Sequence, residues 1–325
     1  MRIFLTGGAG YIGSATAETL LANGHSVTVY DSLVTGHRAA IPAAAHFIQA
    51  DLGDAAALKT ALSAQPYDAV MHFAAFIEAG ESMKNPGKYF KNNLTYSLEL
   101  IEAAVQAGVR RFVLSSTAAV YQSSDEPLSE NSPLGPNNLY GHTKLMIEQA
   151  LEWYRQIHGL HYAALRYFNA AGGFAHRGEA HQPESHLIPL TLQVPLGQRA
   201  KIYIYGTDYP TPDGTCIRDY IHIRDLVSAH LLALDALGER EQMVYNLGNG
   251  AGYSVREVIE TAREVTGHPI PVEETPRRAG DAPRLVAASE RIQRELGWQP
   301  QTPALKDIIA SAWEWHQTHP HGYIA

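Results

Sequence analysis

The sequence is poor in cysteine, in long apolar runs and in positive charge, and each shortage excludes a class of protein. Its 325 residues include one cysteine, Cys216, which excludes an internal disulfide framework and is typical of a reducing compartment. No run of about 18 apolar residues occurs, so we expect no transmembrane helix and no membrane partner. The formal net charge of −8 argues against nucleic acid as the main partner, because nucleic-acid-binding proteins carry basic surfaces.

The N-terminus also lacks the features of a secretory leader. It opens directly into the short apolar run Ile3–Leu5, without a charged segment and a long apolar core. We therefore expect no signal peptide and a cytoplasmic location. The rest is ordinary for a globular protein, with 45% hydrophobic and 18% charged residues and a length that suits one large domain or two unequal ones.

The first 170 residues alternate short β-type runs with longer helical patterns such as Ser14–Asn23 and Tyr96–Ala107. The runs are apolar nearly throughout, as in strands that are covered on both faces of a sheet. They predict strands at Arg2–Thr6, Ser26–Tyr30, His46–Gln49, Ala69–Phe73, Arg111–Ser115 and Tyr162–Tyr167. Repeated βα units of this kind predict an α/β fold with a Rossmann-like, doubly wound parallel sheet.

The character of the sequence changes after Asn169. Residues 170–215 are rich in Gly, Pro, His and Thr, and helical patterns return at Ile223–Leu237, Ser254–Thr266 and Ser289–Leu296. We predict a Rossmann-like domain over residues 1–171 and a smaller mixed α/β domain over residues 172–325, with some later segments able to return to the first domain.

A glycine-rich turn, Thr6-Gly7-Gly8-Ala9-Gly10-Tyr11-Ile12-Gly13, follows the first predicted strand. Glycines at these positions allow a sharp turn, the close approach of a pyrophosphate to the backbone and tight packing of the next helix. The N-terminus of that helix attracts phosphate through its N–H groups and dipole. The placement between a strand and a helix therefore predicts a dinucleotide site.

Acidic residues after the next two strands bear on the kind of dinucleotide. Asp31 ends the second strand, about 20 residues on, where a carboxylate binds ribose hydroxyls and repels a 2′-phosphate. NAD is therefore predicted rather than NADP, although Arg38 nearby leaves NADP open. Asp51, after the third strand, fits either a contact with the adenine edge or a simple strand-end turn.

A tyrosine and a lysine begin another helical pattern, which runs to about Ile157. Tyr140 and Lys144 are spaced i, i+4 and project from one face of the helix. A nearby ammonium is expected to lower the tyrosine pKa from about 10 toward neutrality, where the phenol can transfer protons. Ser115 and Thr117 end a strand at the ligand-binding edge of the sheet and could hydrogen-bond the tyrosine and a substrate hydroxyl.

These motifs resemble the extended short-chain dehydrogenase/reductase superfamily over essentially the whole chain, most closely its UDP-galactose 4-epimerases. The matching stretches are TGGAGYIGS, FAAFIEAGES, NN at Asn92-Asn93, SSTAAVY, YGHTK, LRYFNAAG, YGTDYPTPDGTCIRDYIHIRDL, YNLGNG and RRAGDAPR. The resemblance implies an NAD-dependent enzyme that interconverts UDP-glucose and UDP-galactose through a 4-keto sugar. It also implies a homodimer that packs the Tyr96–Ala107 and Tyr140–Ile157 helices across a twofold axis.

The resemblance also implies roles for individual residues. The catalytic residues would be Tyr140 as the base/acid, Lys144 as its partner and Thr117. The NAD-binding residues would be Gly7, Gly10, Tyr11, Ile12, Gly13, Asp31, Asp51, Leu52, Phe73, Ala74, Ala75, Asn92, Ser115, Tyr140, Lys144 and Tyr167. The UDP-sugar would contact Thr117, Tyr140, Asn169, His186, Leu187, Arg218, Arg278 and Asp281. Two arginines could clamp the diphosphate through charge-assisted hydrogen bonds.

The neighbouring residues separate an epimerase from related enzymes. Dehydratases of this fold follow the catalytic threonine with an Asp-Glu pair, whereas Ala118 and Ala119 stand here and cannot move a proton. A non-catalytic NAD-binding regulator would have no need of Tyr140 and Lys144. An epimerase of another UDP-sugar stays open, although Leu285, at a position that gates sugar size in the family, favours plain hexoses.

Other departures from the family pattern concern the cofactor and a late helix. Ile77 stands where some members carry a lysine, and His186 where others carry an asparagine. Ala288 replaces an aspartate, so Ser289 is predicted to cap the following helix instead.

Three histidines recur every five residues, at His176, His181 and His186, among Glu179 and Glu184. The spacing suits neither one helical face nor a common zinc pattern, so we predict a polar substrate lid and no metal site. Cys216 has no evident base partner and is predicted to be a packed or loop cysteine.

Overall fold

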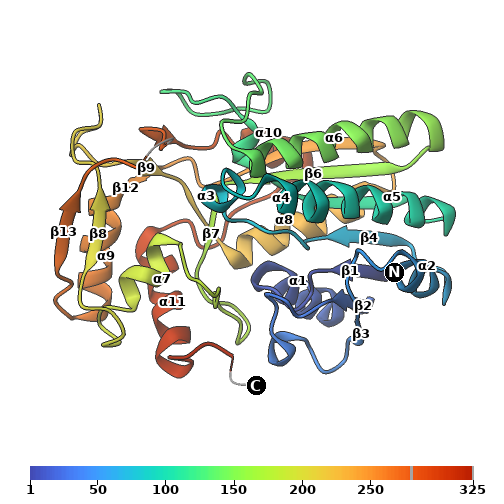
Figure 1. Cartoon of the computed structure of the whole chain (residues 1–325), viewed down its shortest axis with the longest axis horizontal. Coiled ribbons are helices and arrows are strands. Elements are labelled where there is room, and N and C mark those ends of the chain that lie inside the picture. The colour runs from blue at the N-terminus through green and yellow to red at the C-terminus, as the bar shows by residue number, and fades with distance from the viewer. Residues whose placement is uncertain (279–280, 324–325) are drawn as a thin grey trace.

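The computed structural model describes residues 1–278 and 281–323, and its largest element is a seven-stranded sheet (Figure 1). The strands are β1 (Arg2–Thr6), β2 (Ser26–Asp31), β3 (His46–Gln49), β4 (Ala69–His72), β5 (Arg111–Thr117), β6 (His161–Tyr167) and β11 (Gln242–Leu247). All neighbours pair in parallel, in the order β11-β6-β5-β4-β1-β2-β3. This is a doubly wound order that switches between β1 and β4, so the predicted fold class is confirmed.

Helices cover both faces of this sheet. Ile3 and Leu5 pack into the cluster formed with α1, α8 and α10, whereas Phe4 between them packs into the cluster formed with α2, α5 and α6. These helices are α1 (Tyr11–Ala22), α8 (Ile223–Ala236), α10 (Glu290–Leu296), α2 (Ala55–Ser63), α5 (Tyr96–Gln106) and α6 (Leu139–His158). Burial on both sides explains why the strands are continuous apolar runs in the sequence.

All six predicted strands are present, with ends that shift by two residues at most. The seventh strand, β11, was not predicted, and it extends the sheet beyond β6 with the register Gln242↔Tyr162 to Leu247↔Tyr167. A segment after residue 171 therefore contributes a strand to the large sheet. The domain boundary itself stays a prediction.

The other elements of the second region form small sheets and a separate core, which Figure 1 shows beside the large sheet. Ile188, Ile259 and Ile308 lie in this core. Its helices are α7 (Leu187–Leu192), α9 (Val255–Thr266) and α11 (Leu305–Thr318). Its strands are β7 (Asn169–Ala171), β8 (Ile202–Tyr205), β9 (Ile217–Arg218), β10 (Tyr220–His222), β12 (Tyr253–Ser254), β13 (Val272–Thr275) and β14 (Arg284–Leu285).

Caps define the ends of several helices. The Ser254 hydroxyl oxygen accepts a hydrogen bond from the Glu257 N–H at the start of α9, and the Glu257 carboxylate accepts one from the Ser254 N–H. The predicted cap at Ser289 is wrong, because its hydroxyl bonds with the backbone of Gly248 and not with α10. Among the described helices, none is both long and apolar enough to cross a membrane.

Short helical turns connect the larger elements. They are η1 (Arg38–Ala40), α3 (Ala79–Ser82), α4 (Pro86–Tyr89), the π-helix η2 (Phe90–Thr95) and η3 (Ala118–Val120).

Candidate active site

A cleft of about 440 Å³ lies at the carboxyl edge of the large sheet. Its walls include Asp31 at the end of β2, Thr117 at the end of β5 and Tyr167 at the end of β6. Ligands bind at this edge in open α/β sheets, beside the point where the strand order reverses. All sixteen predicted NAD-binding residues line this one cleft.

The glycine-rich turn forms one end of the cleft. Gly7 has φ +73°, and a Cβ there would lie 2.5 Å from the Ala74 nitrogen. A Cβ on Gly13 would lie 2.1 Å from the Gly7 oxygen, so α1 could not approach the turn so closely with any other residue. Gly10 is the N-cap of α1 and no side chain caps this end, which leaves the helix N-terminus directed at the cleft. The turn therefore fits a pyrophosphate.

Asp31 lies beside this turn and accepts hydrogen bonds from the Ala9 N–H at 2.9 Å and the Leu33 N–H at 2.8 Å. Burial raises the pKa of its carboxyl, and these two bonds oppose the increase. Arg38 stacks on the Phe47 ring, 4.3 Å from its centroid, and is not among the residues that line the cleft. The surroundings of Asp31 are consistent with NAD and offer no arginine for a 2′-phosphate.

Asp51 forms the strand-end turn that the sequence allowed, and its contact with the adenine edge stays a prediction. Its Oδ1 accepts from the Gly53 N–H at 2.8 Å, as in a strand-end turn. The residue also lines the cleft next to Leu52.

Tyr140 and Lys144 enter the cleft from the first turns of α6. Asn138 caps this helix by accepting from the Gly141 N–H at 2.9 Å, which fixes where the two side chains leave the backbone. Burial raises the pKa of Tyr140 to about 12, and a hydrogen bond with Thr117 opposes the increase. The Ala119 N–H donates to Thr117 Oγ1 at 3.1 Å and orients that hydroxyl.

The predicted lowering of the Tyr140 pKa is therefore wrong for this structure. Lys144 is 1% exposed, and its Nζ donates to the Ser115 carbonyl oxygen at 2.8 Å. Burial lowers the pKa of Lys144 to about 8, and Glu148 opposes this decrease. Burial thus opposes charge on both groups, and it outweighs the effect expected from their i, i+4 spacing.

Buried polar side chains next to Thr117 and Lys144 form a hydrogen-bond network that holds the strand ends and α6 together. Glu148 accepts from Ser116 and from Arg166, whose Nη2 lies 2.5 Å from Oε2. Ser115 Oγ is hydrogen-bonded to the Tyr167 hydroxyl. These contacts fix the ends of β5 and β6 against α6, and so the positions of Thr117 and Lys144.

The predicted substrate residues fall into two groups. Asn169 and His186 line the cleft together with Thr117 and Tyr140, whereas Leu187, Arg218, Arg278 and Asp281 do not. The last three form a charged cluster of their own. Asp281 Oδ2 accepts from Arg278 Nε at 2.9 Å, and Asp281 Oδ1 lies 3.7 Å from Arg218 Nη2. Arg278 and Asp281 belong to the RRAGDAPR stretch, in which Ala279 and Gly280 lie outside the described residues.

Several residues of the cleft were missed by the sequence analysis. Tyr323 comes from the C-terminal segment, and His37 bridges to the substrate side through a 2.8 Å contact between its Nε2 and the Ala180 oxygen. The π-helix η2, which carries Asn92, is a local irregularity that no periodic pattern reveals. These residues reach the site through long-range packing, so only a resemblance over the whole chain could have indicated them.

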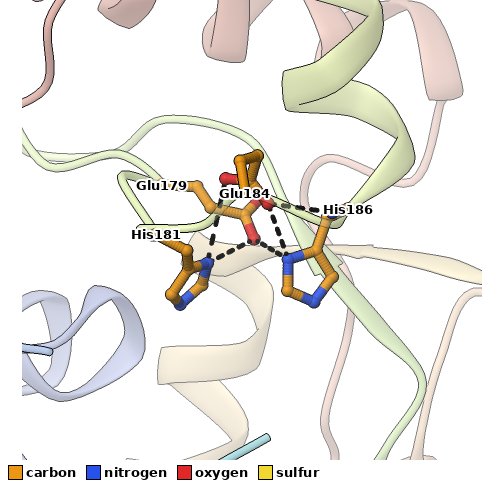
Figure 2. A group of neighbouring side chains, drawn as sticks. All are labelled: Glu179, His181, Glu184 and His186. Carbon is orange, nitrogen blue, oxygen red and sulfur yellow. Dashed lines mark hydrogen bonds and ion pairs between the residues drawn. The ribbon is translucent and has the colours of Figure 1, made fainter. Parts of the chain in front are cut away.

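The histidines and glutamates of the segment after β7 are brought together more closely than their spacing suggested. Figure 2 shows Glu179, His181, Glu184 and His186 pointing toward one another. One possible ligand atom of each residue lies within 4.8 Å of those of the other three. His176 is exposed and lies outside this group. The five-residue spacing does not place these side chains on one face of a helix, but the irregular backbone of the loop brings them together. Cys216 is buried, as predicted.

The sheet order and the glycine turn are those of a dinucleotide-binding enzyme, and Tyr140, Thr117 and Lys144 line the same cleft. The model of the NAD dependent epimerase/dehydratase family matches residues 3–248. A UDP-glucose 4-epimerase of Halalkalibacterium halodurans is 49% identical over 99% of this chain and 98% of its own length. The chain belongs to the NAD dependent epimerase/dehydratase family, which confirms the resemblance seen in its motifs.

Solved structures of UDP-glucose 4-epimerases are similar to this chain in both fold and sequence. The crystal structure of a UDP-glucose 4-epimerase has a TM-score of 0.97 and 49% identity, covering 100% of both chains. A UDP-glucose 4-epimerase of Bifidobacterium longum in complex with NAD⁺ and UDP has a TM-score of 0.94 and 34% identity, covering 99% of this chain and 100% of that chain.

Proposed function

We propose that this protein is an NAD-dependent UDP-glucose 4-epimerase, which interconverts UDP-glucose and UDP-galactose. The observation that carries the proposal is that Tyr140, Thr117 and Lys144 line one cleft, and that Thr117 is followed directly by Ala118 and Ala119. Inversion at one carbon needs a group that removes and returns one proton, and the two alanines add no acid or base for elimination. The names of the relatives support the same activity.

The residues present fit NAD. Gly7, Gly10 and Gly13 would hold the pyrophosphate against the N-terminus of α1, and Asp31 would accept from the ribose hydroxyls. Tyr140 and Lys144 would lie beside the nicotinamide half. The chemistry that NAD would supply when bound is reversible hydride transfer at C4 of the sugar, with no net oxidation.

Tyr140 would act on the proton of the sugar 4-hydroxyl. Because burial raises its pKa to about 12, the phenol stays protonated unless positive charge lies close by. Lys144, on the same face of α6, would supply that charge and stabilise the phenolate. Thr117 would hydrogen-bond the phenol and the substrate hydroxyl, and so align the two oxygens for proton transfer.

The nucleotide half of the substrate would bind toward β9 and β14. Arg218 and Arg278 both approach Asp281, and this places two guanidinium groups near one point. We infer that they bind the diphosphate and that Asp281 accepts from the uridine ribose, while Asn169 and Leu187 would contact the rest of the substrate. Binding through the diphosphate alone leaves the sugar free to turn over and present its other face.

The inferred assembly is a homodimer in the cytoplasm. α6 exposes Trp153 and Ile157, with 63% and 67% exposure, one turn apart on one face. Large apolar side chains so exposed on one helical face are typical of a protein interface. The single cysteine supports a reducing compartment.

The test is to incubate the purified chain with UDP-galactose, without added cofactor, and to follow UDP-glucose by proton NMR. We expect UDP-glucose to appear, because bound NAD co-purifies and is regenerated in each cycle. If no UDP-glucose forms even after NAD⁺ is supplied, while another UDP-sugar such as UDP-N-acetylglucosamine is epimerised, the proposed substrate is wrong and the chemistry stands.

A further inference from the structure

The loop between β7 and α7 carries a compact group of four metal-type ligands, of which only His186 is a predicted contact of the UDP-sugar. Glu179, His181 and Glu184 lie in the loop, and His186 is the N-cap of α7. We propose that Glu179, His181, Glu184 and His186 form a binding site for one divalent transition-metal ion, with Zn²⁺ as the best match, and that the ion holds this loop in place.

The distances suit a tetrahedral ion. Zn²⁺ binds nitrogen and oxygen at about 2.0–2.2 Å, so neighbouring ligand atoms of a tetrahedron lie about 3.4 Å apart. His186 Nδ1 lies 2.8 Å from Glu179 Oε1 and 3.1 Å from Glu184 Oε1. His181 Nδ1 lies 3.1 Å from Glu179 Oε1 and 3.9 Å from Glu184 Oε2. The two Glu184 distances involve different carboxylate oxygens, but one ligand atom from each of the four residues lies within 4.8 Å of the others, so a small rearrangement of the side chains would admit the ion.

The charges also call for a cation. The side chains of Glu179 and Glu184 are only 6% and 8% exposed, so two carboxylates are buried side by side. Buried charges need compensation, which here means either two imidazolium groups or one divalent ion. Arg177 is engaged elsewhere, with Glu18 at 2.9 Å.

Two imidazolium groups explain the geometry less well than one ion. The rings of His181 and His186 are 5.1 Å apart between centroids, so two positive charges would repel one another at close range. His181 Nδ1 is buried and has no hydrogen-bond partner, although it lies 3.1 Å from a carboxylate oxygen. A protonated nitrogen would be expected to donate to that oxygen. An unprotonated Nδ1, whose lone pair is directed at a metal ion, would not form this hydrogen bond.

The donor set selects the kind of metal. Two imidazole nitrogens and two carboxylate oxygens suit Zn²⁺ and related first-row ions better than Ca²⁺ or Mg²⁺, which prefer oxygen ligands alone. Four protein ligands fill a tetrahedral shell, as in structural rather than catalytic zinc sites.

The position of the site gives the ion a structural role. Gly178–Pro183 and His186 form part of the cleft wall, and Ala180 meets His37 across it. An ion shared by residues 179, 181, 184 and 186 would cross-link this wall to the start of α7. This role does not depend on which sugar the enzyme converts.

The test is the metal content of the untagged, full-length protein, because a polyhistidine tag would bind zinc itself. After incubation with excess Zn²⁺ and desalting, we expect about one zinc per chain by mass spectrometry of the metal. His181→Ala and Glu184→Gln should each weaken zinc retention by about tenfold or more. His176→Asn is the matched control, since it removes a histidine from the same loop outside the group, and should retain zinc fully. Asn also tolerates the φ of +63° at residue 176.

A second probe, Co²⁺, reports the geometry. Four-coordinate Co²⁺ absorbs visible light far more strongly than hydrated Co²⁺, so the wild type and His176→Asn should become coloured and His181→Ala should not. Circular dichroism establishes that each variant is folded. The proposal is overturned if the folded wild type retains less than about a tenth of an ion per chain, or if His181→Ala retains zinc as well as the wild type does. No substrate is present in either measurement, so a failed metal test leaves the epimerase proposal untouched.

Discussion

At the scale of single residues, the centre of the site contains two side chains, Tyr140 and Lys144, whose charged forms are disfavoured by burial. Tyr140 has its pKa raised to about 12 and Lys144 has its pKa lowered to about 8. A phenolate and an ammonium formed together would stabilise one another, whereas either alone in this pocket is costly. The pair is therefore poised to exchange a proton with a bound hydroxyl.

Replacement of the phenol tests this role. Tyr140→Phe should lower kcat by about 10²–10⁴-fold, because the proton-transfer group is lost while the ring is kept. The NAD content of the purified variant should be unchanged. Tyr154→Phe on the same helix is the control, because its hydroxyl bonds Glu102 away from the cleft. Turnover by Tyr140→Phe near the wild-type rate would refute the mechanism.

The lysine predicts a pH dependence. A group with a pKa of about 8 carries its proton below that pH and loses it as the pH rises, so the charge that stabilises the phenolate disappears above about pH 8. We expect kcat to fall on the alkaline side with a midpoint near this value. The measurement is initial epimerisation rate against pH at saturating UDP-galactose. A rate that stays level to pH 10 would show that Lys144 does not act through its charge.

At the scale of elements, the close contact between the β1–α1 turn and the start of α1 admits only glycine. In Gly13→Ala the new methyl group would lie 2.1 Å from the Gly7 oxygen, so the turn must shift, at a cost of roughly 1–3 kcal/mol. We expect NAD⁺ binding, measured by calorimetry, to weaken by about tenfold or more. Gly87→Ala in α4, where a Cβ meets no atom within 4 Å, should bind NAD⁺ as the wild type does. Equal affinity in both variants would contradict the assignment of the turn.

The same scale shows what could be predicted from sequence. The six strands with continuous apolar runs and the glycine-rich turn could be predicted, because each has a signal in its own short stretch of sequence. β11 begins with Gln242 and is defined by its pairing with β6, which lies about 80 positions earlier and leaves no local signal. The loop that brings His181 and His186 together has no regular secondary structure. The spacing of the histidines along the chain therefore did not indicate that their side chains lie close together. Tyr323 reaches the cleft for the same non-local reason.

At the scale of the whole molecule, the exposed face of α6 predicts the assembly. Light scattering after size exclusion should give a mass of twice the 35.5 kDa chain. Trp153→Glu places a charge in the proposed interface and should shift the mass to that of one chain. Leu134→Glu, at another exposed apolar residue, should leave the dimer intact. A wild-type mass of one chain would exclude the homodimer.

The central claim concerns the whole cycle, in which the hydrogen on C4 of the sugar leaves and returns without meeting the solvent. The most direct measurement is to convert UDP-galactose that carries deuterium at C4 in ordinary water, and to examine C4 of the UDP-glucose by proton NMR and mass spectrometry. The account predicts that the product keeps the deuterium at C4. UDP-glucose with ordinary hydrogen at C4 would mean that the hydrogen is exchanged with water as a proton, and would contradict the proposed mechanism.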